Sequence, residues 1–300
     1  MRLWVNVARD VRAQAVETVE PGDDNPGVLM FTSGTTGEPK GVLLRHRHLL
    51  AAAHNVVTAH QLTDRDVSYC VLPLFHINAQ VIVLLSTLLS SGRLVMADRF
   101  HASRFWEDVS DHGVTWVSAV PTILSILSKR DPKGIDLSTL RFIRSASAPL
   151  SPAVAQRFEQ IVGAPVIESY GMTEAAGQIS VNPLPPGIRK LGSVGRPQGV
   201  QLKIENTSHQ PVVPYEIGEI AIRGNNVVEG YVNVDGSGKS FGEGWIFTGD
   251  LGYLDDDGYV FITGRAKEII NRGGEKLSPR EIEDVLNASP AVPVCHQRRT

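Results

Sequence analysis

Short apolar runs alternate with longer segments whose apolar residues recur every three or four positions through the first 187 residues. The short runs predict buried strands, because a strand covered on both faces is apolar throughout. They are Val28–Phe31, Val67–Leu74, Arg93–Met96, Thr115–Ser118, Leu140–Ser145 and Val166–Ser169. The longer segments predict helices at Arg47–His60, Ile77–Ser90, Ala102–His112, Thr122–Lys129 and Pro152–Ile161. This alternation predicts an α/β fold with a largely parallel sheet that helices cover on both faces.

The pattern changes after the Pro-rich segment 183–187. Shorter apolar runs separated by turns follow, and they predict a small β subdomain over residues 188–266. Its expected strands are Val200–Glu205, Gly218–Arg223 and Tyr259–Thr263. Residues 233–244 are rich in Gly and Ser, which predicts a loop.

Residues 31–41 read Phe-Thr-Ser-Gly-Thr-Thr-Gly-Glu-Pro-Lys-Gly and hold three glycines, four hydroxyls and one lysine. Glycines let several N–H groups converge on one anion, hydroxyls add donors, and Lys40 adds a compact positive charge. This composition predicts a phosphate-binding loop that leaves the end of the buried strand Val28–Phe31. It is not a Walker A loop, because Gly41 rather than Ser or Thr follows the lysine. The alternative is a plain surface loop.

The segment Ser169–Glu174 holds the groups that ATP requires. The ring of Tyr170 can stack on adenine, Gly171 permits close approach, the Thr173 hydroxyl can reach phosphate, and Glu174 can hold Mg²⁺. The alternative is a strand end at which Tyr170 merely packs.

A further segment, Gly244–Asp250, ends in a carboxylate that can accept hydrogen bonds from both ribose hydroxyls. Arg265 can donate to the same sugar or to phosphate. The alternative for Asp250 is a turn residue that bonds the backbone.

Four segments in this order, 31–41, 169–174, 244–250 and 264–276, resemble the adenylate-forming (AMP-binding) enzymes. This family includes acyl-CoA synthetases, luciferases and the adenylation domains of peptide synthetases. The resemblance implies that the carboxylate of an acid attacks the α-phosphate of ATP, giving an acyl-adenylate and pyrophosphate, and that a thiol then displaces AMP. Positioning and charge neutralisation carry most of such a step.

The resemblance also implies a role for each matching residue. The β- and γ-phosphates would lie on Thr32, Ser33, Gly34, Thr35, Thr36, Gly37 and Lys40. The rest of the nucleotide would contact Ser169, Tyr170, Gly171, Thr173, Asp250 and Arg265, with Tyr170 on adenine and the last two on ribose. Glu174 would carry Mg²⁺. The thiol tunnel would be lined by Gly273, Gly274 and Glu275. The expected catalytic groups are Lys40, Thr173, Glu174 and His76, and the implied cofactors are ATP, Mg²⁺ and coenzyme A.

The resemblance divides the chain into a large domain over residues 1–266 and a following unit over 267–300. Lys267 matches the hinge about which the small C-terminal domain of the family rotates. The unit that follows is expected to be incomplete, with one helix that has Ser278 as its N-cap, Pro279 in its first turn and Glu281 in a capping box.

His76 follows a predicted strand, and the resemblance places it in the acyl pocket; the alternative is a structural histidine. Peptide-synthetase domains usually carry an Asp just after Phe75, and its absence argues against an amino acid substrate. The stretches 140–150, 182–187 and 270–276 resemble the oxalate–CoA ligases of plants and fungi, which favours a small carboxylic acid and CoA. The expected pocket residues besides His76 are Ser145, Ala146, Ser147, Ala148 and Pro149.

Composition adds exclusions. A net charge of −3 with 20% charged residues does not indicate a nucleic acid or an acidic membrane surface as a partner. The apolar stretch Val81–Leu89 is about half of the ~18 residues that a membrane span needs, so it predicts a buried helix. Two cysteines and the lack of a signal-peptide pattern indicate a reducing compartment, which favours the cytoplasm.

Both ends of the chain differ from the family pattern. Only thirty residues precede the phosphate loop, and the family's C-terminal Pro-x-x-x-x-Gly-Lys segment, whose lysine reaches the acyl-phosphate oxygens, has no match here. Losing one such donor typically costs roughly a hundred- to a thousandfold in rate, so we expect weak adenylation from this chain. Three hypotheses stay open: an acyl-CoA synthetase, an adenylation module that loads a carrier protein, and a non-catalytic remnant that binds nucleotide.

Overall fold

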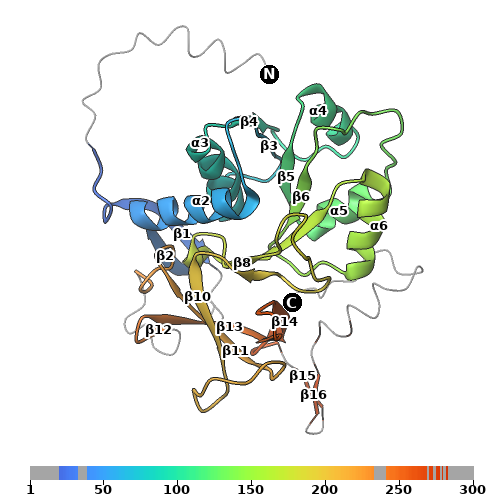
Figure 1. Ribbon diagram of the computed structural model, residues 1–300. Helices are drawn as coiled ribbons and strands as arrows, with labels where there is room; N and C mark the ends of the chain where they lie inside the picture. Colours follow the sequence, from blue (N-terminus) through green and yellow to red (C-terminus); the bar gives the residue numbers. More distant parts are fainter. Residues whose placement is uncertain are drawn as a thin grey trace.

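A computed structural model describes residues 20–32, 39–232, 241–268, 270–272 and 275–277, together with Pro279 and Ile282. The centre of the described chain is a seven-stranded sheet with the order β4-β3-β5-β6-β7-β8-β9 (Figure 1). The parallel strands are β3 (Val67–Cys70), β4 (Arg93–Met96), β5 (Trp116–Ala119), β6 (Phe142–Ser145) and β7 (Val166–Tyr170). Two short antiparallel strands, β8 (Ser180–Val181) and β9 (Arg196–Pro197), complete one edge. The predicted parallel sheet is confirmed.

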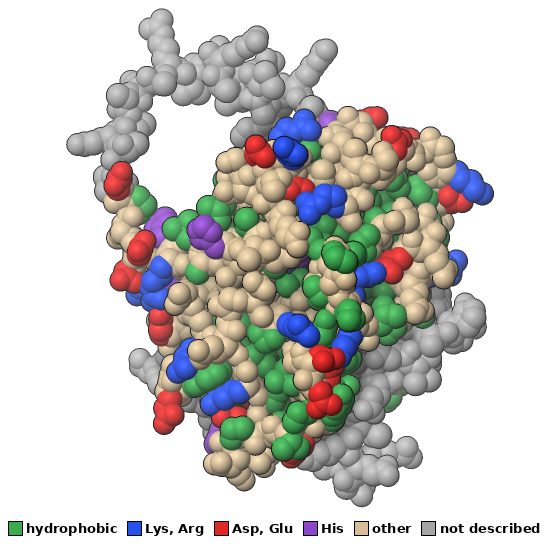
Figure 2. All heavy atoms as spheres, in the orientation of Figure 1, with side chains coloured by type: hydrophobic (Ala, Val, Ile, Leu, Met, Phe, Trp, Pro, Cys, Tyr) green, Lys and Arg blue, Asp and Glu red, His purple; other side chains and the backbone are tan. Residues whose placement is uncertain are grey.

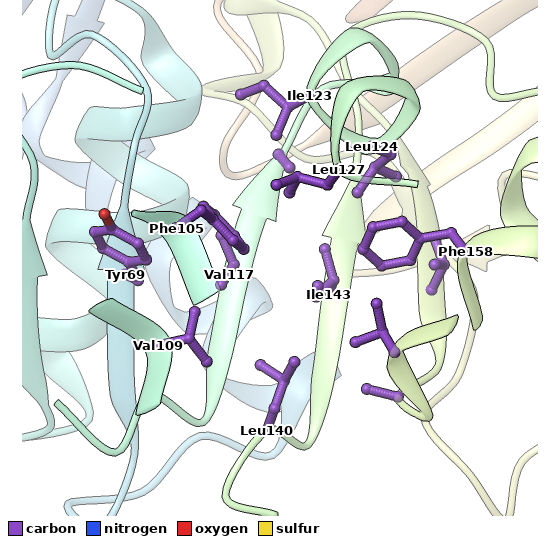
Figure 3. Packing of buried hydrophobic residues seen from close by; sticks show 14 of the residues in the cluster. Tyr69, Phe105, Val109, Val117, Ile123, Leu124, Leu127, Leu140, Ile143 and Phe158 are labelled. Atoms are coloured by element: carbon purple, nitrogen blue, oxygen red, sulfur yellow. The ribbon is translucent and has the colours of Figure 1, made fainter. Parts of the chain in front are cut away.

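Helices cover both faces of this sheet, with α2 and α3 on one side and α4, α5 and α6 on the other (Figure 1). Their bounds are α2 (His46–His60), η1 (Asn78–Leu85), α3 (Ser86–Leu89), α4 (Phe105–Asp111), α5 (Pro121–Leu127) and α6 (Pro152–Val162). The helix predicted over Ile77–Ser90 is helical as expected, but its first two turns have the wide π-helical geometry. Successive residues of β6 show the layering. Ile143 packs toward α5 and α6 (Figure 3), whereas Phe142 packs on the other face, in the cluster that includes Val56 of α2.

The β subdomain is a second, antiparallel sheet in which β10, β11, β13 and β12 follow one another and β14 pairs with β13. The strands are β10 (Val200–Glu205), β11 (Gly218–Gly224), β12 (Phe241–Gly242), β13 (Trp245–Leu254) and β14 (Val260–Arg265). Two expectations were wrong here. Phe241–Gly242 is a strand within the expected loop 233–244, of which residues 233–240 lie outside the described chain. Asp250 lies inside the ten-residue strand β13 and not in a turn.

The prediction that Val28–Phe31 is a buried strand of the central sheet was wrong, because this segment belongs to a separate two-stranded sheet. β1 (Pro26–Thr32) pairs antiparallel with β2 (Lys40–Arg45), and neither strand belongs to the central sheet. Leu29 and Phe31 are 49% and 64% exposed, so β1 is not the buried strand that its apolar residues suggested. A two-stranded sheet has one open face, and apolar residues on that face look the same in sequence as buried ones.

The end of the described chain holds another hairpin, β15 (Ile270–Arg272) with β16 (Glu275–Leu277). Pro279 and Ile282 are helical, as expected, while Ser278 and Glu281 lie outside the described residues. Within the described chain, no helix combines the length and the apolar character that crossing a membrane requires. Basic and acidic side chains are interspersed over the face that Figure 2 shows. The division between 1–266 and 267–300 stays a prediction.

Candidate functional site

The β1–β2 hairpin fixes the ends of the predicted phosphate loop. Thr32 and Lys40 lie opposite each other in its register, and the backbone N–H of Val232 donates to the carbonyl oxygen of Gly41 at 2.9 Å. Five predicted phosphate-binding residues lie outside the described chain, namely Ser33, Gly34, Thr35, Thr36 and Gly37. The structure therefore describes two residues of this expected set, Thr32 and Lys40.

The second motif begins at the end of β7 and continues into the short 3₁₀ helix η2 (Thr173–Ala175). Gly171 is required there, because a Cβ on this residue would lie 1.5 Å from the carbonyl oxygen of Gly177. The Ser169 hydroxyl donates to the carbonyl oxygen of Ser145 at 3.2 Å. This bond joins the adenylate motif to the end of β6, where the predicted acyl pocket begins.

Asp250 connects this motif to the β subdomain. The Tyr170 hydroxyl donates to Asp250 Oδ2 at 2.6 Å, and Arg265 Nε donates to Oδ1 at 2.7 Å. Asp250 is 4% exposed, and it stands opposite Arg265 in the β13–β14 register. Burial and the Asp250 charge raise the pKa of Tyr170, so its hydroxyl stays protonated and keeps donating.

Tyr170, Asp250 and Arg265 are three of the predicted nucleotide contacts, and the structure joins them by hydrogen bonds. Each carboxylate oxygen of Asp250 has two lone pairs, so capacity remains for ribose hydroxyls beside the bonds that it already accepts. Burial would lower the pKa of the Arg265 guanidinium, but the Asp250 charge outweighs it and the pKa is raised. The ring of Tyr170 is 8% exposed and belongs to a buried apolar cluster, so its packing is established while adenine stacking stays a prediction.

Lys40 and Glu174 meet around Tyr231, a residue that no sequence motif indicated. The Tyr231 hydroxyl donates to Glu174 Oε1 at 2.8 Å, and Lys40 Nζ lies 4.7 Å from the centre of the Tyr231 ring. Glu174 is 6% exposed, and no Lys or Arg of the described chain lies within 4 Å of its carboxylate. A buried carboxylate without such a cation fits a magnesium ion, and the lysine beside it fits phosphate oxygens.

The predicted acyl pocket lies at the end of β6. Ser145 and Ala146 are buried, whereas Ser147, Ala148 and Pro149 are exposed. Ser147 has a positive φ of 73°, and Asn78 Nδ2 donates to its hydroxyl at 3.4 Å. His76 is exposed in a turn, with its ring 4.5 Å from that of Phe75, so it is not a buried structural histidine.

Beneath this pocket lies Arg144, whose side chain is 1% exposed. Its Nη1 donates to Ser118 Oγ at 3.2 Å and to Asn78 Oδ1 at 3.4 Å, both neutral acceptors. Burial lowers the pKa of Arg144 to about 9. The sequence did not indicate a site at Arg144, which lies in a mainly apolar run. Only the structure shows that Arg144 is linked to Ser147 through Asn78.

The last predicted residues are described only in part. Lys267 is exposed just after β14, while Gly273 and Gly274 lie outside the described chain. Glu275 begins β16. The structure thus brings the predicted residues Lys40 and Glu174 to one side chain and joins the predicted residues Asp250, Tyr170 and Arg265 by hydrogen bonds. Sequence reasoning missed Tyr231 and Asn78, which carry no local signal.

Comparisons with known proteins agree with this geometry. Residues 4–232 match the family of AMP-binding enzymes. Among curated proteins, the chain is 46% identical over 274 residues to a sulfoacetate–CoA ligase of Cupriavidus necator, covering 91% of this chain and 54% of that protein. It is 44% identical over 284 residues to an oxalate–CoA ligase of Arabidopsis thaliana, covering 93% and 55%. The chain spans about half the length of the curated relatives that it matches.

Solved structures give the same result. The O-succinylbenzoate coenzyme A synthetase of Bacillus subtilis, in complex with ATP and magnesium, superposes with a TM-score of 0.85 at 34% identity, covering 96% of this chain and 60% of that one. ATP-bound MatB of Rhodopseudomonas palustris superposes with a TM-score of 0.86 at 30% identity, covering 95% and 57%. Family match, fold and motif geometry agree, and the chain belongs to the family of AMP-binding enzymes.

Proposed function

We propose that this protein is an ATP-dependent acid–CoA ligase that adenylates a small carboxylic acid and then forms its thioester with coenzyme A. The observation that carries the proposal is the meeting of Lys40 and Glu174 around one side chain, since the two residues come from motifs far apart in the sequence. A lysine and a buried carboxylate in this arrangement are what a magnesium nucleotide requires.

The described residues divide the work of the first half-reaction. Lys40 neutralises phosphate charge as the acid's carboxylate attacks the α-phosphate and pyrophosphate leaves. Thr173 donates a hydroxyl to phosphate, and Glu174 would hold a magnesium ion, which would supply further charge neutralisation when bound. Asp250 and Arg265 hold the ribose, and Tyr170 covers the adenine.

The acid enters beside the end of β6, where Ser147 and His76 are exposed. The sulfoacetate and oxalate ligases among the relatives act on small acids, which supports a small acid here. Rotation about Lys267 would bring the thiol tunnel of Gly273, Gly274 and Glu275 to the adenylate for the second half-reaction. We also propose a cytoplasmic location, which the two cysteines support.

The test is acid-dependent ATP–pyrophosphate exchange with oxalate, sulfoacetate and longer dicarboxylates. Lys40→Ala should lower the exchange rate roughly a hundred- to a thousandfold. The matched control is Lys133→Ala, because the Lys133 side chain is 88% exposed and pairs only with Asp131 among the described residues. CoA consumption would follow exchange in a ligase, and its absence with an acylated carrier protein would indicate a carrier-loading module. Binding of ATP without any exchange would contradict the proposal in favour of a nucleotide-binding remnant.

A further inference from the structure

The segment 226–232, named here the strap, joins the two halves of the nucleotide site. It follows β11 and is bonded to η2, because the Val228 N–H donates to the carbonyl oxygen of Glu174 at 2.9 Å. Asn226, which is fully buried, donates through Nδ2 to the carbonyl oxygens of Ala175 and Gln178 at 2.8 and 3.0 Å. At its other end, Val232 is bonded to Gly41 of the hairpin. The strap therefore fixes the hairpin relative to Glu174.

Tyr231 is the strap residue whose side chain contacts both charged groups. Its hydroxyl donates a hydrogen bond to Glu174, and the face of its ring contacts the ammonium group of Lys40. The ring of Phe241 meets the Tyr231 ring edge-on, with centroids 5.2 Å apart and an interplanar angle of 88°. Packing and backbone bonds thus hold the phenol in one place, with its hydroxyl directed at the Glu174 carboxylate.

The arrangement keeps two opposite charges apart. Within the described chain, Lys40 and Glu174 form no ion pair with each other, although both contact the same side chain. A direct pair between them would be favourable at a half-buried position, and it would occupy the carboxylate and the ammonium together. Tyr231 offers each charge a weaker neutral partner: a hydroxyl donor for the carboxylate and an aromatic face for the ammonium.

We propose that Tyr231 is a positioning residue, which holds Lys40 and Glu174 separate so that phosphate and Mg²⁺ each find a preformed ligand. The proposal rests on the proposed function, since it assumes that these residues receive magnesium and ATP. It gives the two parts of the phenol different tasks. The hydroxyl governs the response to Mg²⁺ through Glu174, and the ring governs the binding of phosphate through Lys40.

The experiment measures ATP binding by calorimetry on the whole chain, once in EDTA and once across a MgCl₂ titration. Tyr231→Phe keeps the ring and removes the hydroxyl, so ATP affinity in EDTA should stay within twofold of the unsubstituted chain. The Mg²⁺ concentration that gives half of the magnesium-dependent gain should rise about tenfold, as expected for the loss of one hydrogen bond to a charged group. Tyr231→Leu removes the ring as well, and it should weaken ATP binding in EDTA also.

Two controls separate positioning from general damage. Tyr253→Phe removes a hydroxyl from another tyrosine whose ring contacts a phenylalanine, Phe261, and should change neither titration. In a Lys40→Ala background, Tyr231→Leu should have no further effect in EDTA if its ring acts through Lys40. Thermal melting checks the fold of each variant, and Tyr231→Phe still decides the question if Tyr231→Leu does not fold.

The outcomes are distinct. An equal Mg²⁺ response of Tyr231→Phe and the unsubstituted chain would overturn the positioning role while leaving the proposed function intact. Equal losses for Tyr231→Phe in EDTA and in Mg²⁺ would overturn it too, because they indicate a merely structural hydroxyl. An unsubstituted chain that binds no ATP under either condition would overturn the proposed function, and the positioning role with it.

Discussion

Replacing Arg144 with Met should stabilise the fold, because this guanidinium carries its charge in a site that water does not reach. Among the described residues it has no carboxylate within 4 Å, and burial lowers its pKa by more than three pH units, to about 9. At about 1.4 kcal/mol for each pH unit, that difference corresponds to a cost of about 5 kcal/mol for holding the charge in the folded state. At neutral pH the group is charged in both states, so the whole cost applies there.

Part of this gain is offset by lost hydrogen bonds. The guanidinium bonds to Ser118 Oγ and Asn78 Oδ1 are long, at 3.2 and 3.4 Å, and contribute about 1.5 kcal/mol each, the low end for bonds to a charged group. Removing them leaves neither partner orphaned, because Ser118 Oγ also donates to Asn78 Oδ1 at 2.8 Å. Met has a similar length and fills the space flexibly. The expected net gain is about 2 kcal/mol, which for a chain of 300 residues corresponds to a rise in melting temperature of about 3 °C.

Chemical denaturation and thermal melting at pH 7 measure this change. The matched control is Arg141→Met, just before the same strand, where the guanidinium pairs with the buried carboxylate of Asp66. That change should destabilise the fold by about 1–2 kcal/mol, since it leaves a buried charge without its partner. A loss of stability of more than about 1 kcal/mol for Arg144→Met would refute the reasoning and show that the surrounding dipoles compensate the charge.

Two further predictions concern Gly171 and Asp66. Gly171→Ala should cost about 3 kcal/mol or more in urea denaturation, because its Cβ would overlap the backbone of Gly177; Gly242→Ala, whose Cβ would meet only Phe247 at 4.0 Å, is the control and should be near neutral. Burial alone would raise the pKa of Asp66, but hydrogen bonds from Thr115, the backbone of Thr63 and Arg141 outweigh it and lower the pKa below its ordinary 3.8. The stabilisation from Asp66 is therefore present above about pH 4 and is lost as pH falls through the lower folded-state pKa, so melting temperatures from pH 7 to pH 3 should fall less steeply in Asp66→Asn; equal slopes would contradict this.

The central sheet was predictable because strands covered on both faces leave a mainly apolar pattern, as in Val67–Leu74. The β1–β2 hairpin was not, since Leu29 and Phe31 are apolar without being buried. Strand β13 was hidden by Thr248 and Gly249, which indicate a turn on their own. In the structure they lie at an irregularity of the strand, between the Phe247–Ala221 and Leu251–Glu219 pairs, where the Thr248 hydroxyl donates to the carbonyl oxygen of Ile220 at 2.9 Å. Local residue chemistry thus suggests individual candidate ligands, whereas it does not show which strands pair across the fold.

The residues of the candidate site also differ in how far the sequence alone indicates their roles. Lys40 and Glu174 have the residue types that phosphate and magnesium need, and each could be proposed from its own motif. The role of Tyr231 could not be proposed from sequence, because it depends on contacts with Lys40 and Glu174, which are distant along the chain. A tyrosine near a strand is common in any sheet and indicates no site by itself.

The cross-strand pair of Asp250 and Arg265 also helps to hold the chain in the β subdomain just before Lys267. Arg265 is the last residue of β14, and the next backbone N–H, that of Ala266, is bonded to the carbonyl oxygen of Gly249 at 2.9 Å. The chain is thus clamped to β13 up to the residue before Lys267. Under the proposed function, a rotation at Lys267 would start from a backbone that is held in the sheet on its N-terminal side, and Asp250, the proposed ribose ligand, would keep its position during that rotation.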